Sequence, residues 1–404
     1  MAQDFSGIRV LDFSQVIAGP FAAQQLALGG ADVVKVEPVD GGDQMRGRML
    51  PSPLGTIGMA SPFLTLNLGK RSLALDLKHP DGKAIALRLV ASADVMIHNF
   101  RAGVVDRLGL DHDTVQALNP RIVCCAISGY GNEGPRSRDA AFDGAIQAAS
   151  GMMANNGDPA TGPMRTGYFP VDMMTGMSAA FAVASALVRR ERTGRGKSLD
   201  VAMLDAAITM QASAFAQCLV DGMPGGLVGN SSATRSPAAD RFETGDGLVL
   251  MSAVSQAHVA VVCDELGVGA LMDDPRYATP AAREANASSF RAHLLDAFAR
   301  DSAVAWTRRL GARGVPVSRV ASIAEALEEP QLAHRDVIVE VAPPTGVDRP
   351  VRLVGAAFKA SEDGPASPRP PPALGEHSRE ILREAGVSAD EIERLIDLRV
   401  VGAC

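Results

Sequence analysis

The sequence predicts an α/β protein with a large Rossmann-like domain, built on a mainly parallel sheet, and a smaller α+β domain. Short apolar runs alternate with helical patterns through residues 8–131, which is typical of a parallel sheet covered on both faces. The chain of 404 residues is too long for one compact core. Strand-like patterns return near the C-terminus, so both ends of the chain are expected to contribute to the large domain.

Periodicity and turn residues define the expected elements of the large domain. Buried strands are expected at residues 8–14, 31–38, 71–78, 94–100 and 121–131. Helices are expected between them at residues 21–30, 81–93 and 111–119. This order of strands and helices predicts a doubly wound sheet.

The pattern changes after about residue 200, where a domain boundary is expected. We assign residues 1–200 to the N-terminal part of the large domain and 201–224 to a linker helix, within a long apolar helix expected at 199–220. Residues 225–330 form the small α+β domain, and 331–404 return to complete the large domain.

Composition restricts the partners and the cellular location. The formal charge of −7 disfavours a nucleic acid as the main partner. The first residues carry no basic segment followed by an apolar core, and apolar runs stop short of the roughly 20 residues that span a bilayer, so no membrane association and a cytoplasmic location are expected. The five Cys and seven His show no metal-binding spacing, so we expect no metal.

Several common catalytic templates do not match. A dinucleotide-binding turn requires GxGxxG after the first strand, whereas this turn has one Gly followed by Pro, which lacks an N–H. Neither a phosphate-binding GxxxxGK[ST] loop nor a GxSxG nucleophile elbow is present. Dinucleotide-dependent oxidoreductases and serine hydrolases are therefore disfavoured.

One acid stands out where a Pro-containing loop gives way to a long apolar helix. Asp172 lies at the start of some sixteen mostly small and apolar residues. The ordinary interpretation is a helix N-cap, because an Asp carboxylate accepts hydrogen bonds from first-turn N–H groups. A catalytic role needs support from the rest of the chain.

That support comes from a resemblance that runs from residue 7 nearly to the C-terminus. The chain resembles the family III CoA-transferases, which include formyl-CoA transferases, carnitine CoA-transferases and alpha-methylacyl-CoA racemases. The matching segments, in the family's order, include GIRVLDFSQVIAGP (7–20), LGGADVVKVEP (28–38), LNLGKRSLALDLKHPDG (66–82), ADVMIHNFRAGVVDRLGL (93–110) and RRERTGRGKSLDVAMLDA (189–206).

The resemblance implies a chemistry for Asp172. The position matches the family's carboxylate nucleophile, which attacks an acyl-CoA thioester and then carries CoA as an aspartyl thioester until a free carboxylic acid accepts it. Coenzyme A thioester is then a substrate, and no permanently bound cofactor is implied. Backbone N–H groups of Gly129–Gly134 are candidate donors to the developing oxyanion.

The family's CoA contacts transfer to eight positions, and its quaternary structure is also implied. Lys78 and Arg107 would bind phosphate groups, and Arg46 is a weaker candidate for that role. The expected CoA-binding residues are Val16, Ala18, Leu75, Lys78, Asn99, Phe100, Arg107 and Met203. A homodimer of two interlocked chains is the quaternary structure that the resemblance implies.

Two departures from family patterns bear on the reaction. In the related racemases a His, one of the two bases, precedes the acid that is Asp143 here, but this chain has Phe142, which carries no proton. This favours CoA transfer over racemisation, the alternative, and leaves Asp143 as either a polar member of the site or a helix cap. Formyl-CoA:oxalate enzymes have Gln where this chain has Ile17, which disfavours oxalate as acceptor. A non-catalytic CoA-binding protein is disfavoured because Asp172 is present.

Overall fold

The computed structural model describes residues 3–232, 234–365 and 369–404, which form two compact units. The large unit contains residues 1–152, 166–223 and 331–404, and the small unit contains 153–165 and 224–330. Residues 201–223, expected as a linker, are therefore part of the large unit. Residues 153–165, expected in the large domain, are part of the small unit.

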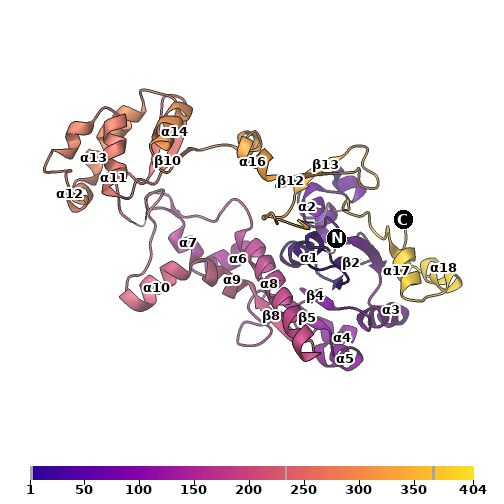
Figure 1. Cartoon of the computed structure of the whole chain (residues 1–404). Coiled ribbons are helices and arrows are strands. Elements are labelled where there is room, and N and C mark those ends of the chain that lie inside the picture. The colour runs from indigo at the N-terminus through magenta and orange to yellow at the C-terminus, as the bar shows by residue number, and fades with distance from the viewer. Residues whose placement is uncertain (1–2, 233, 366–368) are drawn as a thin grey trace. The chain divides into compact units, whose positions relative to one another are not determined.

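The large unit is built on a seven-stranded sheet that is parallel except for its last strand. Figure 1 shows the sheet flanked by helices, with both chain ends in this unit. The strand order is β14 (Val401–Gly402), β3 (Arg71–Leu75), β2 (Asp32–Glu37), β1 (Arg9–Asp12), β4 (Val95–His98), β5 (Val123–Ser128) and β8 (Ser198–Ala202). β14 pairs with β3 in the antiparallel direction, so the C-terminal segment extends the sheet formed by the N-terminal half.

Alternate strand residues face two separate cores, which explains why the strands are almost continuously apolar. On one face, Leu11 and Met96 pack among α3 (Pro80–Val90), α5 (His112–Leu118), α17 (Ser378–Glu384) and α18 (Ala389–Asp397). On the other face, Val10 and Ile97 pack against α1 (Ala18–Leu28) and α8 (Pro170–Thr193). The expected α/β class with a large parallel sheet is confirmed by the topology.

The remaining elements of the large unit surround this framework. They are α2 (Ser61–Leu64), α4 (Val104–Leu108), α6 (Asp143–Ala149), α9 (Met203–Met210) and α10 (Ala212–Asp221), with the hairpin of β12 (Ile338–Val341) and β13 (Val351–Val354). The long helix expected over 199–220 is wrong at its start: residues 198–202 form β8, which pairs with β5 in parallel. Apolarity alone did not distinguish a buried strand from a helix here.

The small unit has its own core of mixed aromatic and aliphatic side chains. In this core Phe242 stacks on Phe298, and Trp306 meets Phe298 edge-to-face. Its sheet contains β9 (Arg241–Glu243), β10 (Leu248–Met251) and β11 (Val317–Arg319), and its main helices are α11 (Gln256–Glu265), α12 (Pro280–Ala285), α13 (Ala287–Phe298), α14 (Ala303–Ala312) and α15 (Ile323–Leu327). A two-stranded ribbon, β6 (Gly157–Asp158) and β7 (Gly162–Pro163), also belongs here. Two short helices, α7 (Met152–Asn155) and α16 (Pro330–Arg335), lie at the unit boundaries.

α8 is long enough, at 24 residues, and apolar enough to meet the length and hydropathy criteria for a membrane-spanning helix. The expectation that apolar segments are too short is thus wrong for α8. Half of the apolar 18-residue stretch of α8 is buried within the protein, as in the core helix of a folded domain. α9 and α10 meet the criteria only when counted as one span, and they are bent by 74°.

Candidate active site

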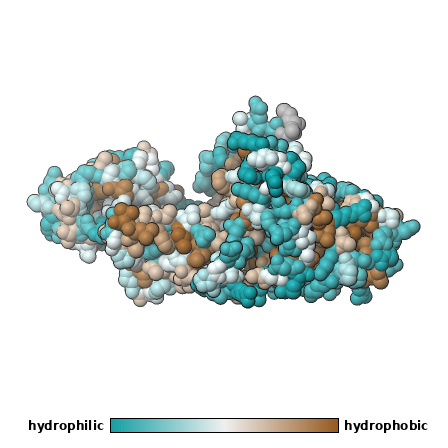
Figure 2. Space-filling model, turned by 90° about the horizontal axis from the view of Figure 1, so that it is seen from below, coloured by the Kyte–Doolittle hydropathy of each residue, from teal (hydrophilic) through white to brown (hydrophobic). Residues whose placement is uncertain are grey.

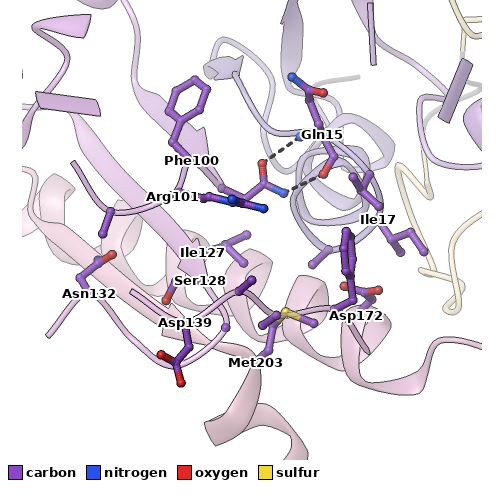
Figure 3. A pocket seen from close by; sticks show the side chains of 18 of the residues that line it. Gln15, Ile17, Phe100, Arg101, Ile127, Ser128, Asn132, Asp139, Asp172 and Met203 are labelled. Atoms are coloured by element: carbon purple, nitrogen blue, oxygen red, sulfur yellow. Dashed lines mark hydrogen bonds between the residues drawn. The ribbon is translucent and has the colours of Figure 1, made fainter. Parts of the chain in front are cut away.

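A cavity of about 300 Å³ opens where the sheet changes its winding direction, between the carboxyl ends of β1 and β4. In doubly wound sheets the connections from two such strands leave toward opposite faces, so a crevice forms at this point. The cavity is lined by segments that follow β1, β4 and β5, together with Asp172 from α8 and Met203 from α9. Figure 3 shows these side chains converging from the different elements.

The loop after β1 forms one wall and is held by side chains from elsewhere. Asn99 accepts a hydrogen bond from the Gln15 N–H at 2.9 Å and donates one to the Gln15 carbonyl at 2.7 Å, as Figure 3 shows. Asp43 accepts a bond from the Val16 N–H at 3.1 Å. Val16 has a φ of 72°, a conformation that costs free energy in a β-branched residue. These bonds therefore hold the loop in a strained shape against the cavity.

Fully buried ion pairs lie beneath this loop. Lys35 is 2.9 Å from the Asp43 carboxylate and donates to the Ser14 carbonyl at 2.9 Å. Lys70 pairs with Asp12 at 2.8 Å and donates to the Pro20 carbonyl at the same distance. Breaking such a pair leaves an uncompensated buried charge, which is costly. The loop and the first turn of α1 are thus fixed to the sheet by charged side chains.

Two glycines let α1 approach its neighbours closely enough to form the site. A Cβ at Gly19 would overlap the Ser14 side chain. A Cβ at Gly176, one turn beyond Asp172 on α8, would lie 2.7 Å from the Ala18 carbonyl oxygen and 2.8 Å from Phe21. The absence of these Cβ atoms brings the N-terminus of α1 and the first turn of α8 to the same cavity.

Asp172 is buried, with 8% of its surface exposed, and its carboxylate has no hydrogen-bond donor among the described residues. Burial, with a smaller contribution from the negative charge of Asp143, raises the pKa of Asp172 to about 7. A carboxylate that lacks donors and is poorly solvated is a stronger nucleophile than one in water. The first N–H groups of α1, whose N-cap residue Ile17 provides no side-chain acceptor, lie at the same cavity.

Asp143, expected from the sequence as either a polar member of the catalytic site or a helix cap, does not line the cavity. Its carboxylate accepts hydrogen bonds from the backbone N–H groups of Val171, at 2.9 Å, and Asp172, at 3.1 Å. Asp143 therefore caps the N-terminus of α8, not that of its own helix α6, whose N-cap is Phe142. Asp172 lies within the first turn of α8 and is not its N-cap.

The expected CoA-binding residues divide into two groups. Val16, Ala18, Asn99, Phe100 and Met203 line the cavity together with Asp172. The other three do not: Leu75 is completely buried in the core, whereas Lys78 and Arg107 are exposed. Arg46 is buried and forms a two-pronged pair with Glu37, at 2.7 and 2.8 Å, so its guanidinium is already occupied.

Sequence reasoning missed two cationic residues of the cavity. Arg101 and Arg138 both line it, and neither guanidinium has a partner in the part of the chain that the structure describes. Figure 3 shows the Arg101 side chain extending across the cavity. Arg101 directly follows the expected residues Asn99 and Phe100, and this position at a strand end is the signal that could have identified it. Arg138 lies in a loop for which the sequence offers no such signal.

The loop after β5 forms the opposite wall. Gly129 and Asn132, from the segment expected to provide backbone donors, line the cavity, as does Phe142. Phe142 has no group that can exchange a proton, so the position expected to distinguish a racemase is apolar at this cavity. Within the described residues, no cluster of three or more His, Cys, Asp or Glu side chains could hold a metal ion.

Comparison with known proteins identifies the family of this chain. The sequence profile described as CoA-transferase family III matches residues 5–378. A succinate–glutarate CoA-transferase from Agrobacterium fabrum is 35% identical over 387 residues, which cover 94% of this chain and 95% of that protein. An acetyl-CoA:oxalate CoA-transferase from Acetobacter aceti is 32% identical over 367 residues, which cover 90% of this chain and 92% of that protein.

The fold also matches a solved structure over almost its whole length. The crystal structure of a CAIB/BAIF family protein from Brucella suis superimposes with a TM-score of 0.86 at 30% identity, covering 95% of this chain and all of that one. Family, fold and activity class expected from the sequence are confirmed. The chain belongs to CoA-transferase family III and is an enzyme with CoA-transferase activity.

Proposed function

We propose that this enzyme moves CoA from an acyl-CoA donor to a free carboxylic acid through an aspartyl-CoA thioester at Asp172. The proposal is supported above all by the buried Asp172 carboxylate: among the described residues it has no hydrogen-bond donor, and the cavity that it lines also holds guanidinium groups without partners. Relatives named for CoA transfer between succinate and glutarate, or from acetyl-CoA with oxalate, agree with a carboxylate acceptor.

The reaction begins when a carboxylate oxygen of Asp172 attacks the thioester carbonyl carbon. A C–O bond forms, the C–S bond breaks, and CoA leaves as a thiolate, which gives a mixed anhydride. The thiolate then attacks the Asp172 carbonyl carbon, forms the aspartyl-CoA thioester and releases the donor acid as a carboxylate. The acceptor carboxylate repeats these two steps in reverse and regenerates the Asp172 carboxylate without net proton transfer.

The first turn of α1 supports the charged intermediates. In each tetrahedral intermediate the former carbonyl oxygen carries negative charge, and N–H groups at a helix N-terminus stabilise such charge. Ile17 and Ala18, at the start of α1, line the cavity together with Asp172, so their N–H groups are the donors for this role, in addition to those expected from the segment that begins at Gly129. Arg101 and Arg138 are suited to the phosphate groups of CoA.

Covalent trapping tests the proposal. The enzyme is incubated with an acyl-CoA panel without acceptor, treated with hydroxylamine or borohydride, and analysed by intact and peptide mass spectrometry. We expect modification at Asp172 and none in Asp172→Ala. Absence of modification with every donor, together with deuterium exchange at the alpha carbon of one of them, would instead support the racemase alternative.

A homodimer is the second part of the proposal. α8 presents Met177, Phe181 and Val188 outward at helical spacing, and Phe181 is 75% exposed. α10 exposes Leu219 and Val220 by 80% and 81%. Figure 2 shows hydrophobic residues gathered in the region of α10. Exposed apolar residues that gather on helix surfaces are typical of an interface, and a second copy is the commonest partner.

We also propose a cytoplasmic location. All five cysteines are free, including the exposed Cys218 and Cys404. Unpaired exposed thiols are usual in a reducing compartment.

A further inference from the structure

A second cavity, of about 250 Å³, shares a lining residue with the active-site cavity. Ile17 lines both cavities. Asp172 lines the first, and its neighbour Met173 lines the second. The second cavity therefore begins beside the nucleophile. We call it the Ile17 cavity, and its lining is Ile17, Phe21, Gln24, Met45, Leu50, Pro62, Thr65, Leu66, Phe169, Met173, Val354 and Gly355.

The two cavities match the two halves of a thioester. The sulfur and the acyl chain leave the carbonyl carbon in different directions, so when CoA occupies the first cavity and the carbonyl lies at Asp172, the acyl chain needs a separate space. Ile17, Phe21 and Gln24 succeed one another along one face of α1, which extends the Ile17 cavity away from the active-site cavity. An apolar cavity of about 150 Å³ holds a benzene-sized ligand, so this one holds a short acyl chain.

None of the described residues that line the Ile17 cavity has an ionisable side chain. Several of these lining residues, including Ile17, Met45 and Leu66, belong to one hydrophobic cluster. The polar side chains are Thr65 and Gln24. The side-chain amide of Gln24 donates to the Thr65 carbonyl at 2.8 Å, and its buried Oε1 has no hydrogen-bond partner among the described residues. Moving a carboxylate into apolar surroundings without a counter-charge is costly.

We propose that the Ile17 cavity binds the acyl chain and selects neutral, apolar acyl groups over acyl groups that end in a second carboxylate. The selected substrates are short or branched aliphatic acyl-CoAs and their free acids. This inference rests on the proposed function, because donor acid and acceptor acid occupy the same acyl position in turn. It differs from the dicarboxylate chemistry in the names of several relatives.

The test compares two donors of the same shape. In 4-methylpentanoyl-CoA an isopropyl group replaces the terminal carboxylate of succinyl-CoA. Each donor is incubated with its own isotope-labelled acid, and the incorporation of label into acyl-CoA gives kcat/KM. We expect kcat/KM to be at least about tenfold higher for 4-methylpentanoyl-CoA, since a tenfold ratio needs about 1.4 kcal/mol.

A positive charge placed at the rim of the Ile17 cavity tests whether the acyl chain binds there. Val354 lines the cavity and is 53% exposed, so Val354→Arg is compatible with folding. The donor ratio is kcat/KM for 4-methylpentanoyl-CoA divided by kcat/KM for succinyl-CoA. Val354→Arg is expected to lower this ratio at least about tenfold, because the guanidinium attracts the terminal carboxylate of the succinyl group. Phe358→Arg is the control, because Phe358 is 51% exposed in the same segment but does not line the cavity. It is expected to keep the wild-type ratio.

The outcomes separate the two levels of the proposal. Equal or faster exchange of succinyl-CoA in the wild type overturns the selectivity while CoA transfer stands. A Val354→Arg ratio equal to that of Phe358→Arg overturns the assignment of the cavity to the acyl chain. Absence of exchange with every donor, with no modification at Asp172, overturns the proposed function and this inference with it.

Discussion

The carboxylate of Asp143 accepts a hydrogen bond from the backbone N–H of Asp172 at 3.1 Å, so one acid positions the helical turn that carries the other. Its negative charge also contributes to the raised pKa of Asp172, after the larger effect of burial. Asp143 is thus a positioning residue. It combines a helix cap with electrostatic tuning of the nucleophile.

Asp143→Asn should shift the pH dependence of the reaction to lower pH. The nucleophile must be ionised, so kcat/KM in the wild type is expected to rise with pH through about 7, the raised pKa of Asp172. Removing the neighbouring charge lowers that pKa and moves the midpoint downward. A pH profile of kcat/KM measures the shift, with the exposed Asp205→Asn as control. An unchanged midpoint would contradict the electrostatic coupling.

Asp172→Asn should stabilise the protein at alkaline pH. Because its pKa is raised on folding, the folded state binds more protons than the unfolded state between about pH 4 and 7, and stability falls as pH rises through that range. The Asn side chain does not ionise, so the variant lacks this loss of stability. Its free energy of unfolding is expected to exceed that of the wild type by a few kcal/mol at most at pH 8, and not to exceed it at pH 4.

Denaturant unfolding of Asp172→Asn at the two pH values measures the difference. Asp273→Asn, which replaces an exposed acid, is the matched control and should follow the wild type. A gain of equal size at pH 4 and pH 8 would refute the linkage.

Gly176→Ala should impair both stability and catalysis. The new Cβ would meet the Ala18 carbonyl oxygen and Phe21, which forces α8 away from α1 and displaces Asp172. We expect about 1–3 kcal/mol of destabilisation and a fall in kcat of at least about tenfold. Gly311→Ala on α14, where a Cβ meets nothing within 4 Å, is the control and should stabilise by about 0.5–1 kcal/mol. Similar behaviour of both variants would argue against close helix packing as the cause.

Arg101→Ala and Arg138→Ala should each raise KM for acyl-CoA about tenfold at low salt, with a smaller effect at high salt. Lys78→Ala and Arg107→Ala test the positions expected from the sequence, and Arg121→Ala, which removes a surface ion pair with Glu191, is the control. Parallel assays with dephospho-CoA thioesters, which lack the 3′-phosphate, show which cation binds that group. Substitution of that cation by Ala should not raise the KM for the dephospho substrates. If Arg101→Ala and Arg138→Ala both keep the wild-type KM for acyl-CoA, neither arginine contributes to CoA binding.

Phe181→Asp and Leu219→Asp should weaken the proposed homodimer by about 100-fold or more, because a carboxylate in an apolar interface is poorly solvated. Light scattering over a concentration series measures the dissociation. Val304→Asp is the control, since Val304 is 59% exposed on α14. A wild-type protein that remains monomeric throughout the series would refute the homodimer.

The sequence alone determined the α/β class, because the strands are apolar on both faces and alternate with helices, and those patterns are local. Matching motifs along almost the whole chain determined the family and pointed to Asp172. The sequence was less informative after residue 198, where β8 and α9 share one apolar run. Periodicity does not distinguish a doubly buried strand from a buried helix in a short segment.

The tertiary structure decided which charged residues belong to the site. Arg46 and Arg101 are both Arg near strand ends, but a buried Glu37 neutralises the first, and only the second is free at the cavity. The cap of α8 comes from Asp143, 29 residues before Asp172, and the Ile17 cavity combines residues from α1, α8 and β13. Pairing of buried charges and the shape of a cavity depend on distances between segments remote in sequence, which no local pattern encodes.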